Sequence, residues 1–178
     1  IGQIYYYRSE FDKSIEYFKK YFEVNKKSKS PRAVAGAANN IASAFMELKR
    51  FDDALQYYVQ AMRIYDSLNI KLGVAIIKDN IGSLFLEKKQ YNDALLYHTD
   101  ALRIFEELGS QSRSCVCLRN IGLTHSRLNN PELAINFLNR SLAIALKLKQ
   151  KETQKDVYEA LSDVYQQTKN FEKAFSNY

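Results

Sequence analysis

Three asparagines, Asn40, Asn80 and Asn120, recur along the chain at a constant spacing of 40 residues. A side-chain amide carries both hydrogen-bond donors and an acceptor, so it can pair with a peptide backbone whatever the peptide's sequence. Three such amides at equal intervals suit one extended ligand. In the alternative interpretation, each amide pairs with the backbone of the neighbouring repeat or with water. These are the polar positions that the sequence singles out for a binding role.

Residues that carry catalytic or metal chemistry form no matching pattern. The two histidines, His98 and His125, each replace an aromatic residue of the repeat, and a metal site between them is only a weak alternative. Cys115 and Cys117 would point about 200° apart on a helix, so they cannot bridge each other and are expected to be small core residues. No Ser/His/Asp order, Gly-rich phosphate loop or ligand-spaced acid cluster occurs. We therefore expect no enzyme activity, no cofactor and no bound metal.

Small residues keep the same period as the asparagines. One series is Gly2, Ala42, Gly82, Gly122 and Ser162; a second is Ser14, Ala54, Ala94, Ala134 and Ala174; a third is Ala61, Ala101 and Ser141. Apolar residues around them recur at helical spacing, with breaks such as Lys88-Lys89-Gln90. Small side chains allow helices to approach closely where they cross. The sequence therefore predicts an array of helix hairpins.

Helix ends are also marked. Ser30-Pro31 and Asn130-Pro131 are typical of an N-cap followed by proline at the first helical position. Gly109 suits the left-handed residue that follows a helix, and Ser110 can begin the next one.

This pattern resembles the tetratricopeptide repeat family. Ile81-Gly82, Phe85, Tyr91, Ala94, His98 and Ala101 match the family's Leu-Gly, aromatic and alanine positions in order. The resemblance covers essentially the whole chain and implies an all-α fold, a right-handed superhelix of stacked hairpins. We expect a single solenoid domain over residues 1–178. Its full hairpins would span 30–69, 70–109 and 110–149, with partial hairpins over 1–29 and 150–178.

The repeat is longer than the usual 34 residues, and the proline that normally ends the second helix is missing. Asp66, Glu106 and Leu146 stand in its place, so both helices of each hairpin should be longer. This long form resembles Pins-type spindle-orientation adaptors and Rap-type peptide-sensing regulators. It most closely resembles the sensor regions of tetratricopeptide-containing histidine kinases and response regulators of Bacteroides-group bacteria, through strings such as that over 101–109.

The resemblance implies that the first helix of each hairpin lines a concave wall, which binds extended peptides or a partner helix. The candidate peptide-binding residues on this face are Asn40, Asn80, Asn120, Glu47, Asp79, Ser83, Glu87, Arg119 and Arg127. Arg119 and Arg127 can fork onto a ligand carboxylate; alternatively, they pair with Asp79, Glu87 or Glu159 across the groove. Tyr6 and Tyr7 also fall on the groove side, whereas most other aromatic residues should pack in the core.

Bulk properties narrow the choice of partners. The net charge of +6 is mild, and its two cationic clusters, Lys26, Lys27, Lys29 and Arg32 and then Lys147, Lys149, Lys151 and Lys155, fall at expected helix ends, where cations complement the helix dipole. We therefore expect no nucleic-acid partner. No apolar run approaches the length of about 20 residues that spans a bilayer, so no direct membrane contact is expected from this segment. The chain begins at Ile1, which favours an excerpt of a longer protein.

The sequence thus predicts a non-catalytic protein- or peptide-binding scaffold, the sensory or interaction region of a larger signalling protein. One alternative is a self-association module that forms a homodimer within a regulator. Another is a Rap-type peptide-sensing regulatory domain. The location would be periplasmic in a membrane sensor and cytoplasmic otherwise.

Overall fold

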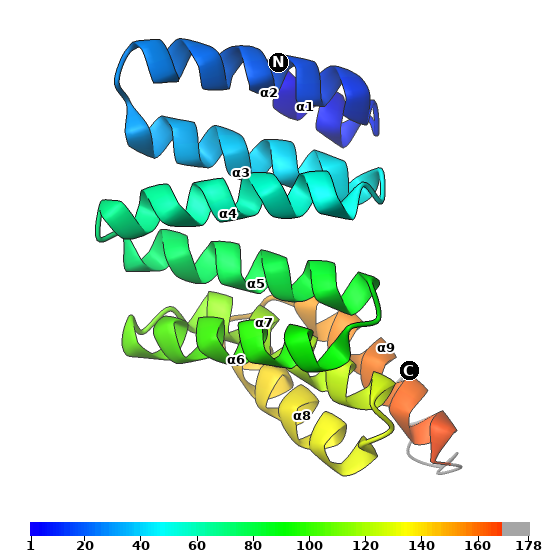
Figure 1. Cartoon of the computed structure of the whole chain (residues 1–178). Helices are drawn as coiled ribbons and strands as arrows, with labels where there is room; N and C mark the ends of the chain where they lie inside the picture. The colour runs from blue at the N-terminus through cyan, green and yellow to red at the C-terminus, as the bar shows by residue number, and fades with distance from the viewer. Residues whose placement is uncertain (169–178) are drawn as a thin grey trace. The chain divides into compact units, whose positions relative to one another are not determined.

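A computed structural model describes residues 1–168, and all regular structure over that range is α-helical. The helices are α1 (Gly2–Tyr7), α2 (Phe11–Lys27), α3 (Pro31–Glu47), α4 (Phe51–Ser67), α5 (Lys71–Glu87), α6 (Tyr91–Glu107), α7 (Gln111–Arg127), α8 (Pro131–Lys147) and α9 (Lys151–Gln167) (Figure 1). Each helix from α2 to α9 has 17 residues. Two such helices with their turns make one 40-residue period, so the predicted all-α hairpin array is confirmed.

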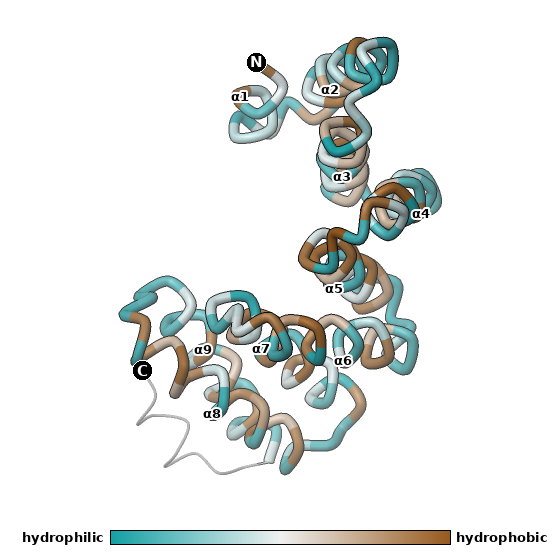
Figure 2. Tube along the Cα trace, turned by 90° about the vertical axis from the view of Figure 1, so that its left-hand side faces the viewer, coloured by the Kyte–Doolittle hydropathy of each residue, from teal (hydrophilic) through white to brown (hydrophobic). Residues whose placement is uncertain are grey.

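The chain divides into two compact units, Ile1–Leu84 and Phe85–Tyr178. The first unit holds α1 to α4 and most of α5, and its odd-numbered helices lie on one side of its even-numbered helices (Figure 2). The second unit holds the end of α5 and helices α6 to α9. The single domain over residues 1–178 stays a prediction, and Ala174 of the small-residue series lies outside the described residues.

One backbone conformation ends every helix from α1 to α8. The second residue after the helix has a positive φ; these residues are Ser9, Lys29, Lys49, Asn69, Lys89, Gly109, Asn129 and Lys149. At Gly109, the backbone N–H donates to the Glu106 carbonyl (3.0 Å), and the N–H of Ser110 donates to the Phe105 carbonyl (2.8 Å). This is the Schellman motif, which satisfies carbonyls that the helix leaves unpaired. The stop signal missing at Asp66, Glu106 and Leu146 is therefore supplied by the turn.

The predicted N-cap residues Ser30, Ser110 and Asn130 do occupy N-cap positions, but none of their side chains makes a capping hydrogen bond. Their backbones bridge two helices instead. The N–H of Ser110 closes α6, and its carbonyl accepts the N–H of Ser114 in α7 (2.9 Å). Because one residue serves both helices, the turns stay short and the period stays constant.

The left-handed lysines offer a test of these turns. A residue with a Cβ pays for the left-handed conformation, whereas glycine does not. We expect Lys29→Gly to raise the free energy of unfolding by about 0.5–1 kcal/mol. This gain is the energy saved in the left-handed conformation minus the entropy that the more flexible glycine loses on folding. The matched control, Lys27→Gly in the last turn of α2, should lower it by about 0.5–1 kcal/mol. Urea denaturation followed by circular dichroism measures both, and a shift of the same sign in both variants would contradict the prediction.

The small-residue positions within residues 1–168 are buried, as predicted for helix crossings. A Cβ added to Gly122 would lie 2.8 Å from Cγ of Leu138 and 3.2 Å from the Ala134 carbonyl oxygen. A Cβ added to Gly2 would lie 2.8 Å from the Phe18 ring. A side chain at either position would therefore require Phe18 or Leu138 to move.

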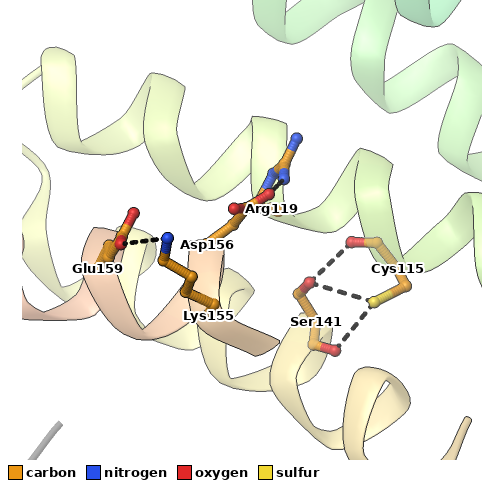
Figure 3. A network of polar contacts seen from close by, with 6 residues as sticks. All are labelled: Cys115, Arg119, Ser141, Lys155, Asp156 and Glu159. Carbon is orange, nitrogen blue, oxygen red and sulfur yellow. Dashed lines mark hydrogen bonds and ion pairs between the residues drawn. The ribbon is translucent and has the colours of Figure 1, made fainter. Parts of the chain in front are cut away.

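The cysteines and His98 also take core positions, whereas His125 is half-buried and stacks on Phe137. Cys115 and Cys117 are buried free thiols, and Cys117 Sγ donates to the His98 carbonyl (3.0 Å). Cys115 Sγ donates to the carbonyl of Ser141 (3.2 Å), whose Oγ donates to the Cys115 carbonyl (2.7 Å) (Figure 3). His98 is fully buried.

Candidate functional site

The asparagines of the first unit form a chain of side-chain hydrogen bonds. Asn80 Nδ2 on α5 donates to Oδ1 of Asn39 on α3 (2.8 Å), and Asn39 Nδ2 donates to Oδ1 of Asn40 (3.4 Å). Asn80 therefore pairs with a side chain of the neighbouring repeat, which neither sequence interpretation specified. Asn39 was missed because it stands one residue off the 40-residue period, although the Asn39-Asn40 doublet is visible in the sequence.

Asn40 is left with an unused donor. Its Oδ1 accepts from Asn39, and its Nδ2 makes no hydrogen bond to any part of the chain that the structure describes. The side chain lines a cavity of about 160 Å³. The other lining residues are Gln3, Tyr6, Tyr7, Phe18 and Ser43. The asparagine network thus orients this amide so that it offers a donor to the cavity.

Glu47 has a partner within the chain. Tyr6 Oη donates to Glu47 Oε1 (3.0 Å), which links α1 to α3. Burial of the phenol, followed by the hydrogen bond and the charge of Glu47, raises the pKa of Tyr6 well above its usual range. The phenol therefore stays protonated and keeps this donation. Tyr7 beside it is 78% exposed.

The remaining candidates of the first unit belong to α5. Asp79 and Ser83 are half-buried, and Ser83 Oγ donates to the Asp79 backbone carbonyl (3.2 Å). A similar bond on α3 joins Ser43 Oγ to the Asn39 carbonyl (3.1 Å). Burial raises the pKa of Tyr58, whose hydroxyl lies 3.3 Å from Ser43 Oγ, to about 12. This face of the first unit thus carries the acidic groups Glu47 and Asp79 among neutral hydroxyl and amide side chains.

In the second unit, Arg119 on α7 forms an ion pair with Asp156 on α9 (Figure 3). The partners predicted within the chain were Asp79, Glu87 or Glu159. Glu159 instead pairs with Lys155 in its own helix, at 3.7 Å. Because Asp156 engages the Arg119 guanidinium, the predicted fork onto a ligand carboxylate would have to displace or share this ion pair.

The last three candidates differ in accessibility. Asn120 is only 8% exposed, and its backbone carbonyl accepts a hydrogen bond from Oγ1 of Thr124 (2.7 Å). Glu87 and Arg127 are exposed in the last turns of α5 and α7. The three predicted asparagines are therefore not equivalent, because Asn40 alone among them lines the cavity described above.

A common offset connects successive odd-numbered helices. Tyr6 and Glu47, Asn39 and Asn80, and Ser126 and Gln167 are each separated by 41 residues and joined by a side-chain hydrogen bond. The Ser126 to Gln167 bond, from α7 to α9, is 3.3 Å long. Successive odd-numbered helices are therefore joined through residues that lie 41 apart, one more than the 40-residue period. The period alone does not reveal this shift.

Equal helix pairs with polar contacts between odd-numbered helices define a helical-repeat protein of the α–α solenoid class. The tetratricopeptide repeat family model matches residues 33–107 and 73–147, which together make up more than half of the chain. The chain therefore belongs to the tetratricopeptide repeat family, as its sequence pattern predicted. Within the described residues, no helix is both long and apolar enough to cross a membrane.

Three solved structures illustrate the fold. BtubC from P. vanneervenii is 20% identical with a TM-score of 0.85 over 99% of this chain and 73% of that chain. The kinesin light chain TPR-like repeats from Podosopora anserina are 12% identical with a TM-score of 0.78, over 99% of this chain and 87% of that chain. The Rap conjugation gene regulator of plasmid pLS20, in complex with the Phr* peptide, is 21% identical with a TM-score of 0.83, over 99% of this chain and 49% of that chain. These identities show a shared fold alone, and no curated protein sequence matches the chain.

Proposed function

We propose that this chain is a non-catalytic scaffold that binds an extended peptide, or an extended segment of a partner protein, along its odd-numbered helices. The observation that carries the proposal is the uncommitted Nδ2 of Asn40, held in place by Asn39 and Asn80. A ligand backbone carbonyl can accept from this group without rearrangement of the protein. The Rap regulator, which has the same fold and was solved with a peptide, supports the proposal.

The asparagine network explains how the site can bind without regard to ligand sequence. A backbone carbonyl recurs in every residue of a peptide, so an amide donor can recognise any extended segment. Because Asn40 Oδ1 is already occupied, the amide cannot flip without losing its bond to Asn39. The site is therefore organised before the ligand arrives, which lowers the entropy cost of binding.

The role in a signalling or sensory protein belongs to the same proposal. A peptide that bridges successive odd-numbered helices would change how these helices stack, and an output region could respond to that change. Self-association into a homodimer, Rap-type regulation, and the absence of nucleic-acid and membrane partners remain predictions.

A triple substitution tests the binding surface. Asn40→Ala, Asn80→Ala and Asn120→Ala together should weaken binding of a peptide selected from a random library by about tenfold, since a hydrogen bond contributes about 0.5–1.5 kcal/mol and the network that orients Asn40 is also lost. The control replaces three exposed asparagines of even-numbered helices, Asn92, Asn136 and Asn139, with alanine. Isothermal titration calorimetry measures both, and unchanged affinity in the first variant would refute the proposal.

A further inference from the structure

The cavity lined by α1, α2 and α3 has the dimensions of a single aromatic ring. Its volume is about 160 Å³, and an apolar cavity of about 150 Å³ in another protein holds benzene. Phe18, which is almost fully buried, and Tyr6 and Tyr7 from α1 contribute aromatic rings. We propose that this cavity receives one tyrosine side chain of the bound peptide. The inference rests on the proposed function and specifies which ligands that surface selects.

The cavity walls suit another ring. Tyr6 and Tyr7 lie edge to face, with centroids 6.3 Å apart and planes at 84°. Aromatic rings attract one another in edge-to-face and offset arrangements, so a ligand ring gains contacts here that an aliphatic side chain does not. Tyr6 is held in place by its bond to Glu47, whereas Tyr7 is 78% exposed and can be covered by the ligand.

The lining disfavours acidic side chains. All six residues around the cavity are neutral, and the nearby carboxylate of Glu47 accepts a hydrogen bond from Tyr6. An acidic ligand group would lose water and gain no opposite charge in return, which is strongly unfavourable. The cavity therefore selects against aspartate and glutamate.

The polar atoms favour tyrosine over phenylalanine. Asn40 Nδ2 carries two N–H donors, so one can serve a ligand backbone carbonyl and the other a phenolic oxygen. The Gln3 side chain makes no hydrogen bond within the described part of the chain and lies at the same cavity. A phenylalanine ring would cover the Asn40 donor without pairing it, and an unpaired buried donor is costly. A tyrosine therefore fills the cavity with its ring and accepts the Asn40 donor with its phenolic oxygen.

The test uses the whole chain and four synthetic peptides of the form acetyl-Gly-Gly-X-Gly-Gly-amide, in which X is Tyr, Phe, Leu or Glu. Titrations followed by 15N-resolved NMR should give the tightest binding for Tyr, at least threefold weaker binding for Phe, at least tenfold weaker for Leu, and none for Glu. The Asn40 side-chain amide should show the largest shift with the Tyr peptide. Equal binding of all four peptides would overturn the inference.

Matched variants separate the cavity from the rest of the surface. Tyr7→Ala should weaken Tyr-peptide binding about fivefold, whereas Tyr21→Ala, which removes a tyrosine that is 53% exposed on α2, should not. Asn40→Ala should abolish the preference for Tyr over Phe. Equal affinities of the two tyrosine variants, or a preference that survives Asn40→Ala, would overturn the inference.

The outcome also distinguishes this inference from the proposed function. A library-selected peptide that needs the three asparagines but tolerates loss of its aromatic residues would overturn the tyrosine site and leave the scaffold proposal standing. Failure of every library peptide to bind would overturn both. A selected peptide that binds through a required tyrosine, and loses affinity in Tyr7→Ala, would support both.

Discussion

Leu138→Ala is expected to lower the free energy of unfolding of the second unit by about 3–4 kcal/mol, within the range for fully buried leucines. Leu138 is 0% exposed and belongs to a core cluster with Val157 and Leu161 of α9. Its loss would leave a cavity that the rigid helix backbones cannot close. Leu146→Ala in the same helix is the control, since that leucine is 50% exposed and should change stability by about 0.5 kcal/mol or less.

Gly122, which faces Leu138, provides a second test of this prediction. Gly122→Ala alone places a Cβ 2.8 Å from Leu138 Cγ, and such overpacking costs about 1–3 kcal/mol. In the Leu138→Ala background, the new methyl group enters the vacated space. The double variant should therefore be more stable than the sum of the single effects by at least about 1 kcal/mol. Urea denaturation of all four proteins measures this coupling; additive effects would mean that the two side chains do not share this space.

Gly73→Ala and Gly36→Ala should shift stability in opposite directions, although both glycines lie in helices of the first unit and face the same residue. A Cβ at Gly73 would lie 2.5 Å from Cγ of the Tyr65 ring, whereas a Cβ at Gly36 would lie 3.8 Å from its hydroxyl. We expect Gly73→Ala to lower the free energy of unfolding by about 1–3 kcal/mol through overpacking. Gly36→Ala should raise it by about 0.5–1 kcal/mol, because alanine is the better helix former.

Tyr65→Ala provides the control. Without the ring, Gly73→Ala should no longer destabilise and should behave like Gly36→Ala. Thermal and urea denaturation, each followed at 222 nm, measure the four variants. If Gly73→Ala destabilises equally with and without Tyr65, the ring is not the cause and the prediction is wrong.

The repeat architecture could be predicted from the sequence because its signals are local. Helical spacing of apolar residues, small residues at fixed intervals and the left-handed position at Gly109 each depend on a few neighbouring residues. These signals predicted the hairpins and the helix ends near Ser30, Gly109 and Asn130. They did not reveal that lysine occupies four of the left-handed positions, because a Schellman turn can form around any residue at a modest energetic cost.

The site was predictable only in part. The sequence alone identified Asn40, Asn80, Arg119 and Glu47 as polar positions of the odd-numbered helices. Their partners, Asn39, Asp156 and Tyr6, were decided by the tertiary structure. A hydrogen bond depends on how one helix is shifted and rotated against the next, and this stacking is not contained in the period of either helix. The sequence therefore determined which amides recur, and the arrangement of α1, α2 and α3 decided that Asn40 lines a cavity.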